Sequence, residues 1–266
     1  GSGMRGLGRT SPPSEPPRRP LDLPAFRPGQ VEKAPPCQAA CPISGDIRGW
    51  VGIVAQRAKL GLDEEAAYRR AWETITEVNP FPAALGRICP HPCEDLCTRR
   101  DKDGAVSINA LERFLGDWGL FRSLSLPASE DGSWPESIGV VGSGPASLSF
   151  AYQMARRGYP VTVYEQDETP GGMLRHAIPD YRLPKEVLDA EIDRLMKLDV
   201  TLERNVDVGV TVSLDELRDK HTLLFLGLGA QAGGLFKLST GSICVLGHDH
   251  GQRAINCWNA PTTGTF

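Results

Sequence analysis

The sequence predicts an α + α/β fold, in which a small helical domain precedes an incomplete Rossmann-like domain. Up to about residue 126, apolar residues recur mainly at helical spacing. Beyond a linker at 127–136 they gather into short buried runs, and the first of these, Ile138–Val141, leads into a glycine turn and a helical stretch. Strand, glycine turn, helix and strand in this order are typical of a βαβ unit.

Four segments are expected along the 266 residues of the chain. They are a proline-rich arm at 1–36, a helical domain at 37–126, a Rossmann-like domain at 137–235 and an irregular tail at 236–266. The arm is too rich in proline to bury a core, so we expect it to be extended.

The composition favours neither nucleic acid nor a membrane as a partner. The net charge is −4, and no apolar run approaches the roughly 18 residues that a membrane-spanning helix needs. We therefore expect no direct membrane insertion and no nucleic-acid binding. The expected location is the cytoplasm or a matrix-like reducing compartment.

Capping residues mark the expected helices of the first domain. Asp63 is expected to cap a helix that ends near Asn79, because the proline that follows disfavours helix at that position. Ser107 is expected to cap a second helix, with Leu111 and Leu115 on its apolar face.

Further elements are expected in the Rossmann-like domain. Val161–Tyr164 is a second short strand, and residues 185–198 form an amphipathic helix. Ser213 and Glu216 form a capping-box signature for one more short helix. Residues 222–226 are a buried strand.

Five cysteines carry the strongest chemical signal. They lie four positions apart within two runs, as Cys37 and Cys41, then Cys89, Cys93 and Cys97. A proline follows both Cys41 and Cys89 and stops any helix there, and this spacing indicates an iron–sulfur cluster. A disulfide scaffold is disfavoured, since 7 cysteines in 266 residues are far fewer than in a small secreted domain. Structural zinc is a second alternative, which spacing alone does not exclude.

The glycine turn GSGPAS is the second signal. Its candidate binding residues are Gly142, Gly144, Pro145, Ala146 and Ser147. Gly142 allows a tight turn, and Gly144 lets backbone N–H groups approach a pyrophosphate at the amino end of the following helix. Ser147 replaces the usual third glycine, and Glu165, at the end of the second strand, is placed to accept from ribose hydroxyls. The turn predicts dinucleotide binding, with a purely structural turn as the alternative.

A second Gly-x-Gly motif follows the strand at 222–226. It contains Gly227 and Gly229, but the residues beyond Ala232 have no helical periodicity, so no helix amino end is available there for a phosphate. We expect this motif to be a turn that closes over the nucleotide.

Several motifs stand in an order that resembles a known family. They are CxxxCP, a CPxPCxxxC run near residue 90, GSGPAS, Glu165, the PGGML turn at 170–174 and the run IPDYRLP at 178–184. Together they resemble the small (beta) subunit of glutamate synthase. The same module occurs in dihydropyrimidine dehydrogenase and in related NAD(P)H-dependent flavoproteins, and the resemblance covers about residues 35–232.

The resemblance implies two cofactors. It implies that the dinucleotide is FAD and that the helical domain holds [4Fe–4S] chemistry, which argues against zinc as the metal. It places Gly171 and Gly172 against the flavin side, in a cofactor-binding turn that continues through Met173 and Leu174.

The resemblance also implies that the metal ligands interleave. The first set is Cys41, Cys89, Cys93 and a position that Glu112 matches. The second set retains Cys37 and Cys97 but lacks its upstream CxxC, because RPGQVEKAPP contains no cysteine. One [4Fe–4S] cluster is therefore predicted, on the first three cysteines and either Glu112 or a remaining cysteine. The alternative for Glu112 is a solvated helix carboxylate.

The predicted function is that of an electron-transfer subunit. Too few residues follow Ala232 for a nicotinamide-binding domain, so we expect NAD(P)H to act only if another chain supplies its site. The chain would then be an oxidoreductase that needs partner redox subunits and passes electrons between FAD and the cluster. No catalytic acid, base or nucleophile is predicted.

Two other functions stay open from the sequence. One is a stand-alone NAD(P)H-dependent oxidoreductase of the glutamate synthase small-subunit type. The other is a non-catalytic assembly subunit that retains the fold, which the proline-rich arm and the unusual tail favour because such segments commonly wrap neighbours. A well-folded preparation without bound flavin would support the assembly subunit.

Overall fold

The computed structural model describes residues 34–128, 132–227, 243–249 and 252–260. Most of the predicted arm lies outside these residues, as do Gly229 and Ala232 of the second glycine motif. Among the described residues, no helix combines the length and the apolar character needed to cross a bilayer.

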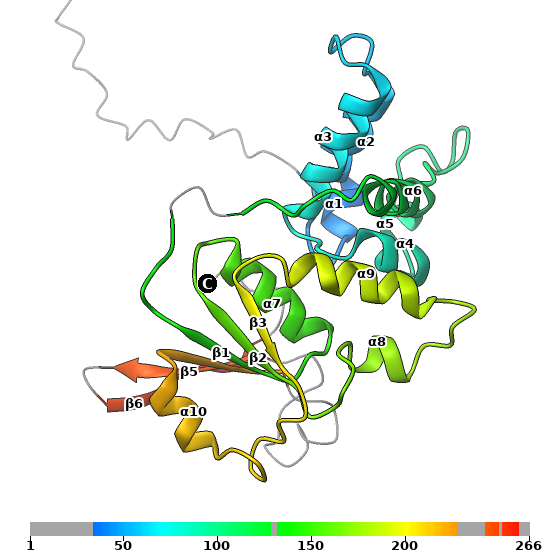
Figure 1. The fold of residues 1–266 in the computed structure, drawn as a ribbon. Coiled ribbons are helices and arrows are strands. Elements are labelled where there is room, and N and C mark those ends of the chain that lie inside the picture. Colours follow the sequence, from blue (N-terminus) through cyan, green and yellow to red (C-terminus); the bar gives the residue numbers. More distant parts are fainter. Residues whose placement is uncertain (1–33, 129–131, 228–242, 250–251, 261–266) are drawn as a thin grey trace, which may run out of the picture. The chain divides into compact units, whose positions relative to one another are not determined.

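Short helices make up the first part of the described chain (Figure 1). They are α1 (Pro36–Ala40), α2 (Ile47–Ala55), α3 (Glu64–Thr76), α4 (Pro82–Ile88), α5 (Pro92–Asp95) and α6 (Ile108–Phe121). Asp63 caps α3 as predicted, because its carboxylate accepts a 2.7 Å hydrogen bond from the Ala66 N–H. Ser107 has the predicted cap position of α6, but its side chain makes no capping hydrogen bond.

Two glycines let α4 and α6 pack backbone against backbone. A Cβ atom on Gly116 would lie 2.3 Å from the Ala83 nitrogen, and one on Gly86 would lie 2.5 Å from the Cα of Arg113. Neither position has room for a side chain. The close approach matters because each helix brings one predicted ligand to the site described below.

A sheet and its helices form the second part (Figure 1). The strands are β1 (Ile138–Val141), β2 (Val161–Tyr164), β3 (Val200–Glu203), β4 (Leu223–Leu226), β5 (Ile243–Asp249) and β6 (Gln252–Ala260), in the order β3-β2-β1-β4-β5-β6. The helices are α7 (Pro145–Ala155), α8 (Met173–His176), α9 (Lys185–Leu195) and α10 (Leu214–Lys220). The first four strands of that order run parallel, in agreement with the predicted Rossmann-like fold.

The sheet differs from the sequence prediction in two places. The sequence pattern does not predict β3, because its residues VTLE are partly exposed and form no continuous apolar run. Within the tail at 236–266, which the sequence predicts to be irregular, lie β5 and β6, which pair antiparallel with β4 and with each other. The aliphatic run ICVL in β5 has the composition that favours a strand.

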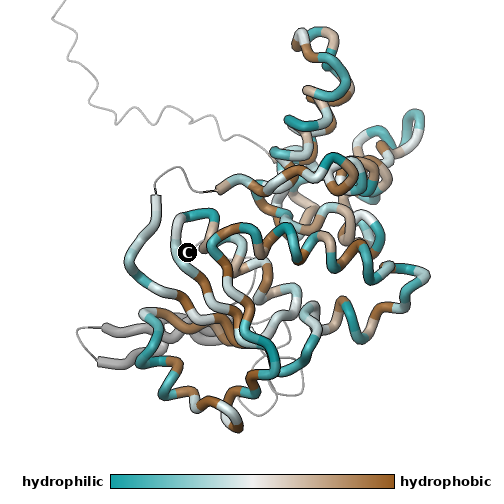
Figure 2. The backbone as a smooth tube through the Cα atoms, in the orientation of Figure 1, coloured by the Kyte–Doolittle hydropathy of each residue, from teal (hydrophilic) through white to brown (hydrophobic). Residues whose placement is uncertain are grey.

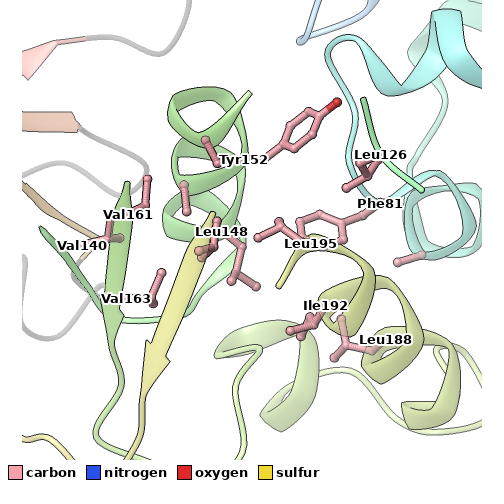
Figure 3. Packing of buried hydrophobic residues seen from close by; sticks show 14 of the residues in the cluster. Phe81, Leu126, Val140, Leu148, Tyr152, Val161, Val163, Leu188, Ile192 and Leu195 are labelled. Carbon is pink, nitrogen blue, oxygen red and sulfur yellow. The ribbon is translucent and has the colours of Figure 1, made fainter. Parts of the chain in front are cut away.

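One hydrophobic cluster takes residues from both parts of the described chain. Phe81 and Leu126 from the helical part pack in it with Leu148 of α7 and Leu195 of α9 (Figure 3). Teal and brown alternate along α9 in Figure 2, as expected of an amphipathic helix that buries one face. The shared burial of apolar surface therefore stabilises the helical part against the sheet part.

Candidate functional site

Three of the predicted cluster ligands face one cavity in the helical part. Cys41, Cys89 and Cys93 line it together with Glu112, and apolar side chains that include Trp50 form much of the remaining wall. These four donors come from the end of α1, the end of α4, α5 and α6. Folding, and not sequence spacing alone, brings them to the same place.

The ends of short helices position the thiols. Cys41 directly follows α1 and Cys89 directly follows α4, while Cys93 lies within α5. Between the last two, His91 adopts a left-handed backbone conformation with φ of 46°, and its N–H donates to Cys89 Sγ at 3.3 Å. The tight turn at His91 thus presents both thiols to one cavity, and N–H bonds to sulfur are among the features that tune iron–sulfur clusters.

A buried amide fixes Glu112. Asn79, between α3 and α4, donates from Nδ2 to Glu112 Oε1 at 2.8 Å. Its Oδ1 accepts the Phe81 N–H at 2.9 Å, so Asn79 is itself held in place. Glu112 therefore has a defined, partly buried position on the cavity, unlike the solvated carboxylate given as the alternative.

Burial disfavours negative charge on these donors when no metal is bound. Burial, with smaller contributions from Cys41 and Cys89, raises the pKa of Cys93 to about 11. It also raises the pKa of Cys89, and it raises the pKa of Glu112 to about 7 despite the lowering effect of the Asn79 hydrogen bond. A metal cluster would favour the opposite state, because bound iron stabilises thiolates.

Cys37 and Cys97 do not line this cavity. Cys37 lies in α1 and packs against a hydrophobic cluster of the helical part. Cys97 lies after α5, and hydrogen bonds from the backbone N–H groups of Val106 and Arg99 lower the pKa of its thiol. This separation agrees with the interleaved arrangement that the resemblance implies.

The donor set is compatible with a cubane cluster. Cys37, Cys41, Cys89, Cys93 and Cys97 are free thiols, in contrast to a disulfide scaffold. Across the described ranges, no three His, Cys, Asp or Glu side chains lie close enough together to hold one metal ion. In a cubane cluster each ligand binds a different iron, so the ligands need not meet at one ion. Thiols spread around a cavity are therefore compatible with a [4Fe–4S] cluster.

The two glycine motifs meet at the carboxyl ends of β1 and β4. These strands are neighbours although the chain first continues to β2 on the other side, so a topological switch point lies between them. Gly142 has φ of 87°, and a Cβ atom on it would lie 3.0 Å from the Gly227 carbonyl oxygen. The Gly227 N–H donates to the Val141 carbonyl at 2.9 Å. In open α/β sheets, ligands bind in a crevice outside the carboxyl ends of the strands at such a switch point, so we expect the dinucleotide crevice here.

The amino end of α7 follows the glycine turn at the carboxyl end of β1. Gly144 is its N-cap residue and Pro145 its first residue, and no side chain forms a capping hydrogen bond there. Pro145 and Ala146 are exposed, and a Cβ atom on Gly144 would meet nothing within 4 Å. The first N–H groups of the helix and its positive dipole end are therefore accessible to a phosphate.

Ser143, which the sequence prediction leaves out, connects the glycine turn to two other predicted residues. Its N–H donates to Glu165 Oε2 at 2.7 Å, and its hydroxyl donates to the same oxygen. The hydroxyl also accepts the Gly171 N–H at 3.0 Å. Glu165 is only 5% exposed, and its Oε1 accepts the Asp167 N–H. Glu165 therefore stabilises the glycine turn. That its remaining lone pairs accept hydrogen bonds from ribose hydroxyls stays a prediction.

The PGGML turn lies in backbone contact with the glycine turn. Gly172 has φ of 49°, and a Cβ atom on it would lie 2.8 Å from the Cα of Gly144. Met173 is 64% exposed, whereas Leu174 is 7% exposed and packs in the hydrophobic cluster. Gly171 is thus buried and Gly172 half-buried, Met173 is exposed, and Leu174 anchors the turn to the core.

Ser147 of α7 packs against Gly227, which follows β4. Its side chain is buried, and a Cβ atom on Gly227 would lie 1.7 Å from the Ser147 Oγ. The serine that replaces the third glycine is thus accommodated by a glycine on the neighbouring strand end. No sequence pattern within the first motif alone indicates this pairing.

Comparison with known proteins agrees with both parts of the site. Residues 30–123 match the family model of dihydropyrimidine dehydrogenase domain II, 4Fe-4S cluster, and residues 140–193 match that of an NAD(P)-binding Rossmann-like domain. The NAD-dependent dihydropyrimidine dehydrogenase subunit PreT of Escherichia coli K12 is 33% identical over 223 residues, which are 82% of this chain and 51% of that protein. The chain is a homologue of this oxidoreductase subunit. The resemblance predicted from the motifs is confirmed.

Two further relatives extend the comparison. The NADP(+)-dependent formate dehydrogenase subunit beta of Moorella thermoacetica is 33% identical over 74% of this chain and 30% of its own length. The glutamate synthase [NADPH] small chain of Bacillus subtilis is 33% identical over 72% of this chain and 40% of its own length. The chain therefore spans about a third to a half of these relatives. The predicted iron–sulfur domain and the Rossmann-like domain that follows it are confirmed.

Proposed function

We propose that the chain is an electron-transfer module of an oxidoreductase, with FAD at the glycine turns and one [4Fe–4S] cluster on Cys41, Cys89, Cys93 and Glu112. When bound, FAD supplies the exchange between two-electron and one-electron chemistry, and the cluster supplies one-electron transfer. The observation that carries the proposal is the convergence of three thiols and a fixed carboxylate on one cavity.

In this proposal the chain's own residues act by placement. Gly142 and Gly144 allow the backbone to approach a pyrophosphate, and the amino end of α7 binds its charge. Ser143 and Glu165 keep the glycine turn in shape through the hydrogen bonds between them. In the helical part, the apolar wall limits access of water to the metal ligands, which is one of the factors that set a cluster's potential.

We infer that electrons enter or leave through other redox subunits. The relatives carry names of subunits from formate dehydrogenase, dihydropyrimidine dehydrogenase and glutamate synthase, each with a nicotinamide cofactor in its name. By analogy, this chain would work beside partner subunits, and NAD(P)H would bind outside the two cofactor sites proposed here for FAD and the cluster.

Quantification of cofactors in anaerobically purified protein tests the proposal. We expect about four irons, about four sulfides and about one FAD per chain, with an EPR signal after reduction by dithionite. About eight irons would contradict a single cluster. Folded protein without flavin and without iron would instead support a non-catalytic assembly subunit.

A second candidate is direct binding of NAD(P)H at the same glycine turn. Residues 140–193 match a family of NAD(P)-binding Rossmann-like domains, which favours binding of NAD(P)H. Chromatography of the nucleotide released on denaturation distinguishes the two candidates. FAD in the released fraction supports the proposal, whereas saturable NADPH binding to flavin-free protein that FAD does not displace would support the second candidate.

A further inference from the structure

The carboxylate of Glu191, in α9, binds the amino end of α4. Its Oε1 accepts the Ala83 N–H at 2.8 Å, and its Oε2 accepts the Ala84 N–H at 2.9 Å. Glu191 is 0% exposed, although it stands 108 positions from Ala83 in the sequence. The N-cap residue of α4, Phe81, provides no capping side chain. A carboxylate from a distant helix therefore caps α4.

Arg194 holds this carboxylate in place. Its Nη2 donates to Glu191 Oε1 at 3.1 Å, and its guanidinium carbon lies 5.0 Å from the centre of the Trp72 ring. Both side chains of the ion pair are almost completely buried. The Ala83 N–H, the Ala84 N–H and Arg194 Nη2 all donate to the Glu191 side chain. This position therefore requires a side chain with two acceptor oxygens.

The opposite end of α4 carries a proposed metal ligand. The helix has 7 residues, and Cys89 is its C-cap residue, with its N–H bonded to the Leu85 carbonyl at 2.9 Å. The hydrogen bonds within the helix make so short an element move as a unit. A shift of its amino end would therefore also shift Cys89.

On its other side, α9 is attached to the dinucleotide crevice. Arg175 forms an ion pair with Asp189 of α9, and its Nε donates to the Pro170 carbonyl at 2.6 Å. Pro170 opens the PGGML turn, in which the Gly171 N–H donates to the hydroxyl of Ser143. Hydrogen bonds and ion pairs thus connect the glycine turn to α9, and α9 to α4.

We propose that Glu191 is a positioning residue, which fixes Cys89 relative to the dinucleotide crevice by binding the amino end of α4. The inference rests on the proposed function, because it concerns the relative placement of the two cofactor sites. Glu191 touches neither site and acts through α4. Its expected contribution is a constant geometry between the two sites, on which the rate of electron transfer depends.

The test compares four variants of the complete chain. Glu191→Ala removes the cap, and Glu191→Gln keeps the shape but turns an NH₂ group towards an N–H donor. Glu186→Gln is the matched control, because Glu186 is an exposed carboxylate on the same helix. Leu217→Ala is the control for lost stability, because Leu217 is buried in a different cluster on α10.

Three readouts are recorded on holoprotein. They are the EPR spectrum of the cluster, its midpoint potential and the rate at which it is reduced after rapid reduction of the flavin. In both Glu191 variants we expect a changed spectrum, a shifted potential and a rate at least about tenfold lower. Glu186→Gln should match the unmodified chain, and Leu217→Ala should lower the melting temperature without changing the three readouts. Glu191 variants that behave like Leu217→Ala would overturn the proposal.

Two further readouts use protein without cofactors. In the Glu191 variants, amides of α4 should exchange with solvent faster and Cys89 should be alkylated faster, with Cys97 unchanged as the internal reference. Unchanged exchange in α4 would overturn the proposal.

These readouts also separate the claim about Glu191 from the proposed function. A chain that binds neither iron nor flavin would disprove the proposed function, while α4 exchange would still decide the role of Glu191. If Glu191→Ala does not fold, Glu191→Gln alone decides both readouts.

Discussion

The proposed metal ligands and their neighbouring thiols differ in how firmly the fold holds them. Asn79 fixes Glu112 through one 2.8 Å hydrogen bond, and Cys93 is only 6% exposed on the same cavity. Cys97, by contrast, is bonded to backbone N–H groups outside that cavity. The iron content of single variants can therefore show which of these side chains bind the metal.

Replacement of Glu112 by alanine should remove one iron and leave the rest of the cluster. We expect iron to fall from about four to about three per chain, with an EPR signal in the oxidised protein that is typical of a three-iron cluster. Glu73→Ala is the control, because Glu73 is exposed on α3. About four irons with an unchanged EPR spectrum would show that Glu112 is not a ligand.

Substitution of Gly227 by alanine should disturb the floor of the crevice. Its Cβ atom would lie 1.7 Å from the Ser147 Oγ, and overpacking of this kind costs about 1–3 kcal/mol. We expect lower stability in urea titrations and weaker retention of the flavin. The double variant with Ser147→Gly should recover both, because it removes the clashing oxygen. No recovery would contradict the packing described for this pair.

At the scale of elements, the close contact of α4 and α6 brings Cys89 and Glu112 to one cavity. Gly116→Ala should force the helices apart, because its Cβ atom would lie 2.3 Å from the Ala83 nitrogen. We expect a loss of about 1–3 kcal/mol in the free energy of unfolding together with a lower iron content. Both follow from denaturant titration and an iron assay.

Gly52→Ala is the matched control for this prediction. Gly52 lies in α2, where a Cβ atom would meet nothing within 4 Å. Alanine should therefore be neutral or stabilising by up to about 1 kcal/mol, with the iron content unchanged. Equal effects of the two substitutions would refute a specific role for the contact between α4 and α6.

Elements with local signals could be predicted from the sequence, and elements fixed by pairing could not. Asp63 and the Ser213–Glu216 capping box mark their helices correctly, because these hydrogen bonds join neighbouring residues. The strand β3 has no such signal, since its stability depends on pairing with β2. The strands β5 and β6 of the tail likewise depend on pairing with β4 and with each other, which no local signal indicates.

At the scale of the whole molecule, stability should depend on the protonation of His221. Its ring is 5% exposed, with Tyr164 Oη 2.8 Å from Nε2 and Ser137 Oγ 3.2 Å from Nδ1. Burial, followed by the charge of Lys220, lowers the pKa of His221 below its usual 6.5. The folded chain therefore binds this proton less tightly than the unfolded chain. The stabilisation is complete above about pH 6.5 and is lost as the pH falls through the lower folded pKa.

Chemical denaturation between about pH 7 and about pH 5 tests this dependence. The free energy of unfolding should fall more steeply in the unmodified chain than in His221→Gln, which does not titrate in this range but can accept a hydrogen bond from Tyr164. Equal slopes in the two proteins would mean that His221 has the same pKa when folded and unfolded.

In the candidate site too, motifs of short spacing could be predicted from the sequence, and contacts between distant residues could not. The GSGPAS turn and the cysteine runs could be recognised because their chemistry needs residues at fixed short spacing. The hydrogen bond from Asn79 to Glu112 and the capping of α4 by Glu191 join residues 33 and 108 positions apart. No pattern in a single sequence indicates such pairs, because only folding brings them together.

The iron content of a Cys37→Ala/Cys97→Ala double variant tests the central claim most directly, since neither thiol lines the cavity that holds the proposed ligands. We predict about four irons per chain, an EPR spectrum like that of the unmodified protein and an unchanged flavin content. Loss of the iron, or a fall from about eight irons to about four, would contradict a single cluster on Cys41, Cys89, Cys93 and Glu112.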